Sequence, residues 1–179
     1  MNYIHPTAII GPNVVMGDNN YIGPYCIIGY PAEHKEYWKM ENVIPEGMRE
    51  WVPERLEPVS GKVIIGNNNK FTGHVTIDAG TTGATVIADN VWMLKHSHVG
   101  HDAIIASDVV ISCGAKIGGH CVIGGGNNIG LNAVLHQRTE VPPMCMIGMG
   151  AVITKKTELL PGMKYAGNPA RCLGVNKKP

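Results

Sequence analysis

A six-residue spacing of aliphatic side chains constrains this chain more than any other feature of its sequence. Twelve consecutive aliphatic or methionine residues follow one another at intervals of six: Ile87, Met93, Val99, Ile105, Ile111, Ile117, Ile123, Ile129, Leu135, Val141, Ile147 and Ile153. The same spacing relates the aliphatics of residues 4–28 and the apolar residues of 65–77. A period of six fits neither a 3.6-residue helix nor an alternating strand. It is typical of the hexapeptide repeats of a parallel β-helix.

The repeat predicts an all-β prism in which three hexapeptides form one three-sided coil of 18 residues. The aliphatics would fill the interior, and the residue two positions earlier, which is usually small, would fit the corner. Coils stack at about 4.8 Å, so about seven coils would form a rod about 35 Å tall. Each coil buries a thin core, so neighbouring coils must stabilise one another. Twelve unbroken repeats argue against a β-sandwich with short strands.

Composition narrows the function classes. The length of 179 residues suits one domain, so residues 1–179 are expected to form a single β-helix domain. A net charge of +1 without a cluster of Lys and Arg argues against a nucleic-acid partner. No apolar stretch is long enough for a membrane span, and residues 1–7 carry no signal segment. Cys26, Cys121 and Cys145 occupy small inward positions, which predicts packing residues in a reducing, cytoplasmic compartment.

Three segments break the repeat. Residues 30–62 have no period and combine Trp38 and Trp51 with many charges and prolines, which predicts a long projecting loop. Loops of this length inside compact domains are usually functional. Residues 79–84 add four residues between two aliphatic positions. Past Ile153 the period stops, and residues 155–179 are expected to cap a prism end that would otherwise expose strand edges.

The histidines suggest where chemistry takes place. Residues 18 apart share a column, and this rule places His101, His120 and His136 at one corner of three successive coils. Asp102 and Gln137 fall at the same corner. Adjacent members would lie roughly 5–7 Å apart at the backbone. A carboxylate beside an imidazole fixes its tautomer and strengthens it as a base, and a neutral imidazole can take the proton of an attacking hydroxyl or amine.

These residues lie in stretches that are similar to the UDP-N-acetylglucosamine O-acyltransferases, which begin lipid A synthesis. The stretches are HPTAIIGPNVVMGDNNYIGPYCIIG, VTIDAGTT, HSHVGHDAIIAS, AKIGGHCVIGG, NAVLHQ and GNPARCLGVN. HVGHD, followed at matching separations by His120 and His136, is the most specific. The resemblance implies a left-handed β-helix, a homotrimer with active sites between subunits, a thioester donor, and neither a tightly bound cofactor nor a metal.

The resemblance also implies roles for individual residues. His101 matches the general base, with Asp102 beside it, and Gly119 matches the residue whose backbone N–H stabilises the oxyanion. Four further residues match those that position the acceptor sugar or the acyl donor: His98, His120, His136 and Gln137. The chain departs from the family in reading Asp78-Ala79-Gly80-Thr81 where His-Arg-Gly-Thr is usual. It also ends before the family's helical domain, which helps to bind carrier protein and nucleotide.

A second resemblance concerns the donor. Residues 152–156 and 167–171 are similar to the end of hexapeptide acetyltransferases, where basic residues meet the phosphates of coenzyme A. The residues that would do so here are Lys155, Lys156, Lys164 and Arg171. The donor is therefore open between acyl carrier protein and coenzyme A. The acceptor is expected to be a hydroxyl or amine of a sugar, with a nucleotide sugar such as UDP-N-acetylglucosamine favoured. The alternative within this class is an acetyl-coenzyme A-dependent sugar acetyltransferase.

Two alternatives come from other classes. The separations of His74, His96 and His101, 22 and then 5, resemble the zinc ligands of γ-class carbonic anhydrases, which share the prism fold. The 18-residue rule places these three histidines at different corners, which argues against a zinc lyase. The other alternative is a non-catalytic trimeric scaffold, in which the histidine corner has no chemical role.

Overall fold

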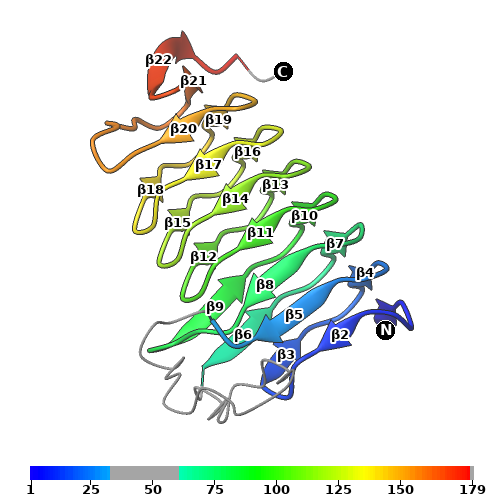
Figure 1. Cartoon of the computed structure of the whole chain (residues 1–179). Helices are drawn as coiled ribbons and strands as arrows, with labels where there is room; N and C mark the ends of the chain where they lie inside the picture. The colour runs from blue at the N-terminus through cyan, green and yellow to red at the C-terminus, as the bar shows by residue number, and fades with distance from the viewer. Residues whose placement is uncertain (33–60, 178–179) are drawn as a thin grey trace, which may run out of the picture.

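The computed structural model of this chain describes residues 1–32 and 61–177. These residues form a parallel β-helix, as the six-residue period predicts, and the helix is left-handed, as the family resemblance implies (Figure 1). The predicted projecting loop of residues 30–62 falls almost entirely on residues 33–60, which lie outside the described residues. No helix in the described ranges is long and apolar enough to cross a membrane.

Three sheets form the three faces of the prism, and from β1 to β20 every third strand along the chain belongs to the same sheet. Sheet A contains β1 (Tyr3–Ile4), β4 (Tyr21–Ile22), β7 (Lys70–Phe71), β10 (Trp92–Met93), β13 (Val110–Ile111), β16 (Asn128–Ile129), β19 (Met146–Ile147), β21 (Met163–Gly167) and β22 (Ala170–Val175). Sheet B contains β2 (Ile9–Ile10), β5 (Ile27–Tyr30), β8 (Thr76–Asp78), β11 (His98–Val99), β14 (Lys116–Ile117), β17 (Val134–Leu135) and β20 (Val152–Ile153). Sheet C contains β3 (Val14–Met16), β6 (Lys62–Ile65), β9 (Ala84–Ile87), β12 (Ile104–Ile105), β15 (Val122–Ile123) and β18 (Glu140–Val141).

The register of these strands explains the core. In sheet A, Met93 pairs with Ile111, which pairs with Ile129, so residues 18 apart lie directly above one another. All twelve aliphatics of the long run are 2% exposed or less. The small residues before them are buried too, among them Ala103 and Cys121. Stacking therefore converts the period of six into a continuous column of side chains, each of which contributes roughly 1.5–3 kcal/mol when fully buried.

The two ends of the prism differ. Ile4 in the first coil is 44% exposed because no coil lies beneath it, whereas Ile22 in the second coil is fully buried. At the other end, β21 pairs with β19 and folds back on β22 as an antiparallel hairpin (Figure 1). The Tyr165 side chain is 2% exposed, and its hydroxyl accepts a hydrogen bond from the Leu160 N–H at 2.6 Å. This hairpin lies over the last coils.

Two corners of the prism carry histidines. The A–B corner joins sheets A and B through residues 73–74, 95–96, 113–114, 131–132 and 149–150. The B–C corner joins sheets B and C through residues 101–102, 119–120 and 137–138, and residues 155–156 make the equivalent turn after β20, from which the chain continues to β21 of sheet A. At the same corner, one coil before residues 101–102, the chain makes a longer excursion through residues 79–83.

The prediction that His74 and His96 lie at different corners is wrong. Both lie at the A–B corner, with their ring centroids 4.7 Å apart in a stacked arrangement. The spacing of 22 residues is one 18-residue coil plus the four residues added between β8 and β9. His101 lies at the next corner, so one chain does not gather the three histidines of the zinc alternative.

Candidate active site

His101 and Asp102 are the two turn residues of the B–C corner between β11 and β12. Asp102 adopts a left-handed φ of 56°, and its Oδ2 lies 2.9 Å from Nδ1 of His101. An ionised carboxylate can only accept, so Nδ1 carries the proton and Nε2 is left with a free lone pair. The Asp102 side chain is 7% exposed and that of His101 is 22% exposed. The buried carboxylate therefore holds an imidazole whose basic nitrogen remains accessible.

The Asp102 carboxylate is enclosed by donors from residues 79–83. Its Oδ2 accepts from the hydroxyl and N–H of Thr81 at 2.6 and 2.9 Å. Its Oδ1 accepts from the N–H groups of Thr82 and Gly83 at 3.1 and 2.9 Å. Burial alone would raise the pKa of Asp102, but hydrogen bonds from Thr81, His101 and Thr82 outweigh it and hold that pKa well below its usual range. Asp102 is therefore an anion throughout the neutral range.

Residues 79–83 were not predicted as part of the site. The sequence contains a signal for them. Counting back from Asp102 by one coil of 18 residues and by the four added residues leads to position 80, within Gly80–Gly83. From the sequence alone these residues are a break in the repeat and part of the stretch VTIDAGTT, with no contact to Asp102 expected.

His120 lies one coil above His101, with the two rings edge to face at 4.9 Å. Its Nε2 is 3.9 Å from Oδ2 of Asp102. Burial and then the positive charge of Arg138 lower the pKa of His120, and the nearby Asp102 only partly opposes this. In the described part of the chain, His101, Asp102 and His120 are also the one group of three possible metal ligands, with ligand atoms within 4.8 Å. Both Asp102 oxygens already accept hydrogen bonds, which suits holding an imidazole better than binding an ion.

Gly119 packs directly against the ring of His101. A Cβ atom at this position would lie 2.7 Å from Nε2 of His101, closer than real Cβ contacts. Only glycine lets the backbone approach the basic nitrogen this closely. Among the described residues the Gly119 N–H donates no hydrogen bond, whereas the His120 N–H is bound to the His101 carbonyl at 2.8 Å. The Gly119 amide is thus a donor beside Nε2 that no described residue uses.

A cavity of about 390 Å³ opens beside His101. It is lined by Ile27, Tyr30, Pro31, Thr76, Asp78, His98 and His101. His98 projects from β11, where its Nδ1 lies 2.8 Å from the Thr76 hydroxyl and its Nε2 lies 3.7 Å from Oδ2 of Asp78. His98 and His101 therefore share one cavity, which we call the His101 cavity. Asp78 lines the same space.

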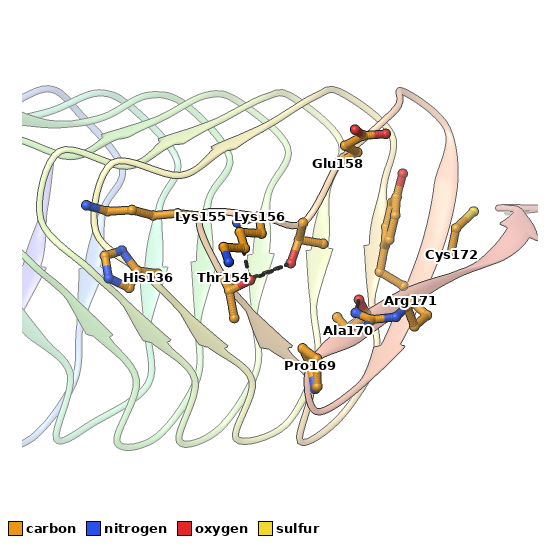
Figure 2. Close-up of a pocket in the computed structure, with 11 residues that line it drawn as sticks. His136, Thr154, Lys155, Lys156, Glu158, Pro169, Ala170, Arg171 and Cys172 are labelled. Atoms are coloured by element: carbon orange, nitrogen blue, oxygen red, sulfur yellow. Dashed lines mark hydrogen bonds between the residues drawn. The ribbon is translucent and has the colours of Figure 1, made fainter.

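A larger cavity of about 690 Å³ lies farther along the same edge, between the last coils and the C-terminal hairpin (Figure 2). Its polar lining includes His136, Lys155, Lys156 and Arg171, and we call it the basic cavity. Lys155 and Lys156 follow β20, and Arg171 comes from β22 on the other side (Figure 2). The structure thus brings together three of the four predicted phosphate-binding residues. Lys164 lies on β21 in sheet A and is not among the lining residues.

The predicted histidine corner is divided between these two cavities. His101 lines the His101 cavity, and His136 lines the basic cavity, where its Nδ1 donates to the Gln137 carbonyl at 2.8 Å. His120 lies next to Asp102 and lines neither of the two cavities. Gln137 is an exposed turn residue that lines neither cavity. The corner is therefore an edge that runs from one cavity to the other.

Comparison with known proteins gives a consistent result. The chain is 30% identical over 198 residues to the acyl-acyl-carrier-protein–UDP-N-acetylglucosamine O-acyltransferase of Paraburkholderia phymatum, covering 98% of this chain and 74% of the relative. It is 30% identical over 164 residues to the enzyme of the same name from Burkholderia orbicola, covering 90% of this chain and 55% of that relative. The chain thus spans between about half and three quarters of the length of these relatives. No family model matches the chain.

Solved structures agree with the sequence relatives. The UDP-N-acetylglucosamine acyltransferase of Bacteroides fragilis superposes with a TM-score of 0.81 at 25% identity, covering 98% of this chain and 61% of that one. The Moraxella catarrhalis protein gives a TM-score of 0.70 at 24% identity, covering 97% and 75%, which supports the fold. With one relative matched across most of both lengths, the chain belongs to the UDP-N-acetylglucosamine O-acyltransferase family of hexapeptide-repeat acyltransferases.

Proposed function

We propose that this protein transfers an acyl group from a thioester to a hydroxyl or amine of a sugar, with His101 as the general base. The observation that carries this proposal is the geometry around His101. Its Nδ1 is engaged by the Asp102 carboxylate at 2.9 Å, and its Nε2 faces the Gly119 backbone beside the His101 cavity, which is the proposed site of the acceptor. A neutral imidazole with one orientated basic nitrogen is the arrangement that general-base catalysis requires.

In the proposed reaction, Nε2 of His101 takes the proton of the acceptor while the acceptor oxygen or nitrogen attacks the thioester carbonyl. The carbonyl oxygen becomes an oxyanion, and the Gly119 N–H donates to it. The tetrahedral intermediate then collapses, the carbon–sulfur bond breaks, and the imidazolium returns the proton to the departing thiolate. Asp102 stays ionised and stabilises the imidazolium between these two steps.

The basic cavity is the proposed site for the donor's phosphate. Lys155, Lys156 and Arg171 line it, and charge-assisted hydrogen bonds to phosphate are among the stronger polar contacts. The turn that carries Lys155 lies three coils above the one that carries His101, which is about 14 Å at the usual strand spacing. An extended thioester arm would link the two cavities. The relatives' names specify acyl carrier protein and UDP-N-acetylglucosamine; here coenzyme A and other sugars remain alternatives.

We also propose that the protein assembles as a homotrimer through sheet C. Five aliphatic side chains form one outward row there, on five successive coils in direct register: Val15, Ile64, Val86, Ile104 and Val122. Four of them are more than a third exposed. Monomeric proteins rarely expose apolar patches this continuous. A second copy carries side chains at the same coil spacing and would match the row, and the row borders the B–C corner with its catalytic residues.

The proposed compartment is the cytoplasm. Cys26, Cys121 and Cys145 are buried packing residues of the coil interior, and burial raises the pKa of each thiol. Buried, protonated thiols of this kind suit a reducing environment.

The proposal is tested by mixing the purified chain with acyl-coenzyme A or acyl-acyl carrier protein of several chain lengths. Acceptors are UDP-N-acetylglucosamine and the corresponding amino sugars, and products are identified by mass spectrometry. We expect transfer from one donor class in wild type and its loss in His101→Ala. Failure of every thioester with every sugar would contradict the proposal.

The proposed trimer is tested by light scattering, which measures the mass of the assembly. A monomer in wild type would contradict the trimer, and Ile104→Asp is expected to dissociate it.

A further inference from the structure

The excursion of residues 79–83 is distinctive among the B–C corner turns. The inward aliphatics that flank residues 101–102, 119–120 and 137–138 lie six residues apart, whereas Ile77 and Ile87, which flank the excursion, lie ten apart. The additional length turns the N–H groups of Thr81, Thr82 and Gly83 toward one carboxylate. Just after it, the buried Thr85 accepts a hydrogen bond from the Asp102 N–H at 2.9 Å. The excursion therefore holds the side chain of Asp102, and the strand that follows it holds the main chain.

We infer that Thr81 is a positioning residue for the acyl-transfer reaction, whose hydroxyl commits the Asp102 carboxylate to His101 rather than to His120. This inference rests on the proposed function of His101 as the base. Thr81 would not touch either substrate. It acts through Asp102, one coil above it.

The distances around Oδ2 of Asp102 support this role. Three donors converge on that one oxygen: the Thr81 hydroxyl at 2.6 Å, the Thr81 N–H at 2.9 Å and Nδ1 of His101 at 2.9 Å. Nε2 of His120 lies 3.9 Å from the same atom, beyond hydrogen-bond distance. A small rotation of the carboxylate would exchange one imidazole for the other.

The contacts of Oδ1 explain why the Thr81 hydroxyl orients the Asp102 carboxylate more than the rest of the excursion does. The N–H groups of Thr82 and Gly83 hold Oδ1, but they would allow the carboxylate to swing about that oxygen. The Thr81 hydroxyl is the shortest contact of Oδ2 and, together with the Thr81 N–H, fixes the second point of the group. The Thr82 hydroxyl, by contrast, lies 3.5 Å from Oδ1, at the limit of a hydrogen bond. The two neighbouring threonines thus provide a test residue and a matched control.

The experiment compares Thr81→Val, which removes only the hydroxyl, with Thr81→Ser, which restores it, and Thr82→Val. In wild type we expect ¹⁵N NMR of the ring nitrogens to show His101 as the Nδ1–H tautomer. In Thr81→Val we expect a mixture of tautomers at His101 and a kcat reduced about tenfold with KM unchanged, since a hydrogen bond to a charged group is lost. Thr81→Ser and Thr82→Val should both resemble wild type. Thr81→Ala provides a second variant without the hydroxyl if Thr81→Val does not fold.

Unchanged His101 tautomer and kcat in Thr81→Val would overturn the inference, and so would equal losses in Thr81→Val and Thr82→Val. The NMR signal does not depend on acyl transfer. If wild type shows no transfer but the tautomer changes as expected, the positioning role stands and the proposed function fails. If wild type is active and the tautomer does not respond to Thr81, the function stands and the positioning role fails.

Discussion

The A–B and B–C corners of this prism use the same backbone and present very different chemistry. Turn residues on both corners adopt left-handed φ angles, 51° and 61° at His74 and His96 and 56° and 57° at Asp102 and His120. At the A–B corner, the rings of Tyr25, His74 and His96 stack on one another at 5.0 and 4.7 Å. Among the described residues, no carboxylate forms an ion pair with these two histidines.

At the B–C corner the imidazoles instead surround a buried carboxylate, and an excursion of the coil below supplies that carboxylate with donors. A repeated corner therefore supplies positions for side chains, whereas their reactivity depends on the hydrogen-bond donors and charges that the neighbouring coil places beside them.

The largest expected effect separates the two corners directly. His101→Ala removes the proposed base and should lower kcat about 10²–10⁴-fold, the usual contribution of general-base catalysis. His96→Ala removes a histidine from the matching turn of the other corner and should leave kcat close to wild type. Steady-state acyl transfer measures both. Equal losses in the two variants would show that the corners do not differ in the way we propose.

Gly119→Ala tests how closely the backbone must approach His101. The added Cβ would come within 2.7 Å of Nε2 and displace the ring, and misplacement of a catalytic group by about 1 Å can cost about 10²-fold in rate. Gly125→Ala is the control at the next corner, since its Cβ would meet only the Ser107 carbonyl at 3.3 Å. Folding of both variants is checked by circular dichroism. A Gly119→Ala enzyme as active as Gly125→Ala would contradict the assignment.

Asp102→Asn tests the enclosed carboxylate through stability. The folded state lowers the pKa of Asp102 below its usual value of 3.8, so the ionised group stabilises the fold fully above that pH and loses this contribution as the pH falls through the lowered pKa. We expect the variant to be less stable by about 2 kcal/mol at pH 7, the scale of hydrogen bonds to a charged group. Thermal unfolding should show the difference shrinking below about pH 4. A pH-independent difference would contradict the role of the charge.

The smallest expected effect concerns the far end of the B–C corner. Lys155→Ala removes an exposed cation from the basic cavity and should raise the KM of the donor up to about fivefold, with little change in kcat, because exposed ion pairs contribute 0.2–1 kcal/mol. Lys95→Ala changes the corresponding turn residue of the A–B corner and should leave KM unaltered. Added salt should reduce the difference between wild type and Lys155→Ala. A KM that responds equally to both changes would place the donor phosphate elsewhere.

Much of the fold was predictable because a β-helix repeats one local rule. The period of six identified the inward column, and the period of 18 correctly stacked Met93, Ile111 and Ile129. The same rule placed His101 and His120 on adjacent coils of one corner, where their rings meet. It failed for His74 and His96, because a fixed period does not account for the four residues added between them.

The sequence by itself determined the coil, its core and, where the repeat is unbroken, the column to which each residue belongs, because stacking strands 18 residues apart leaves little freedom in register. Only the tertiary structure decided that Thr81–Gly83 enclose Asp102, and that His101 and His136 line different cavities along one edge. The physical reason is that the repeat fixes the direction of inward side chains, whereas the direction of corner side chains depends on each turn and on insertions in the coil below, such as residues 79–83. Those insertions follow no period.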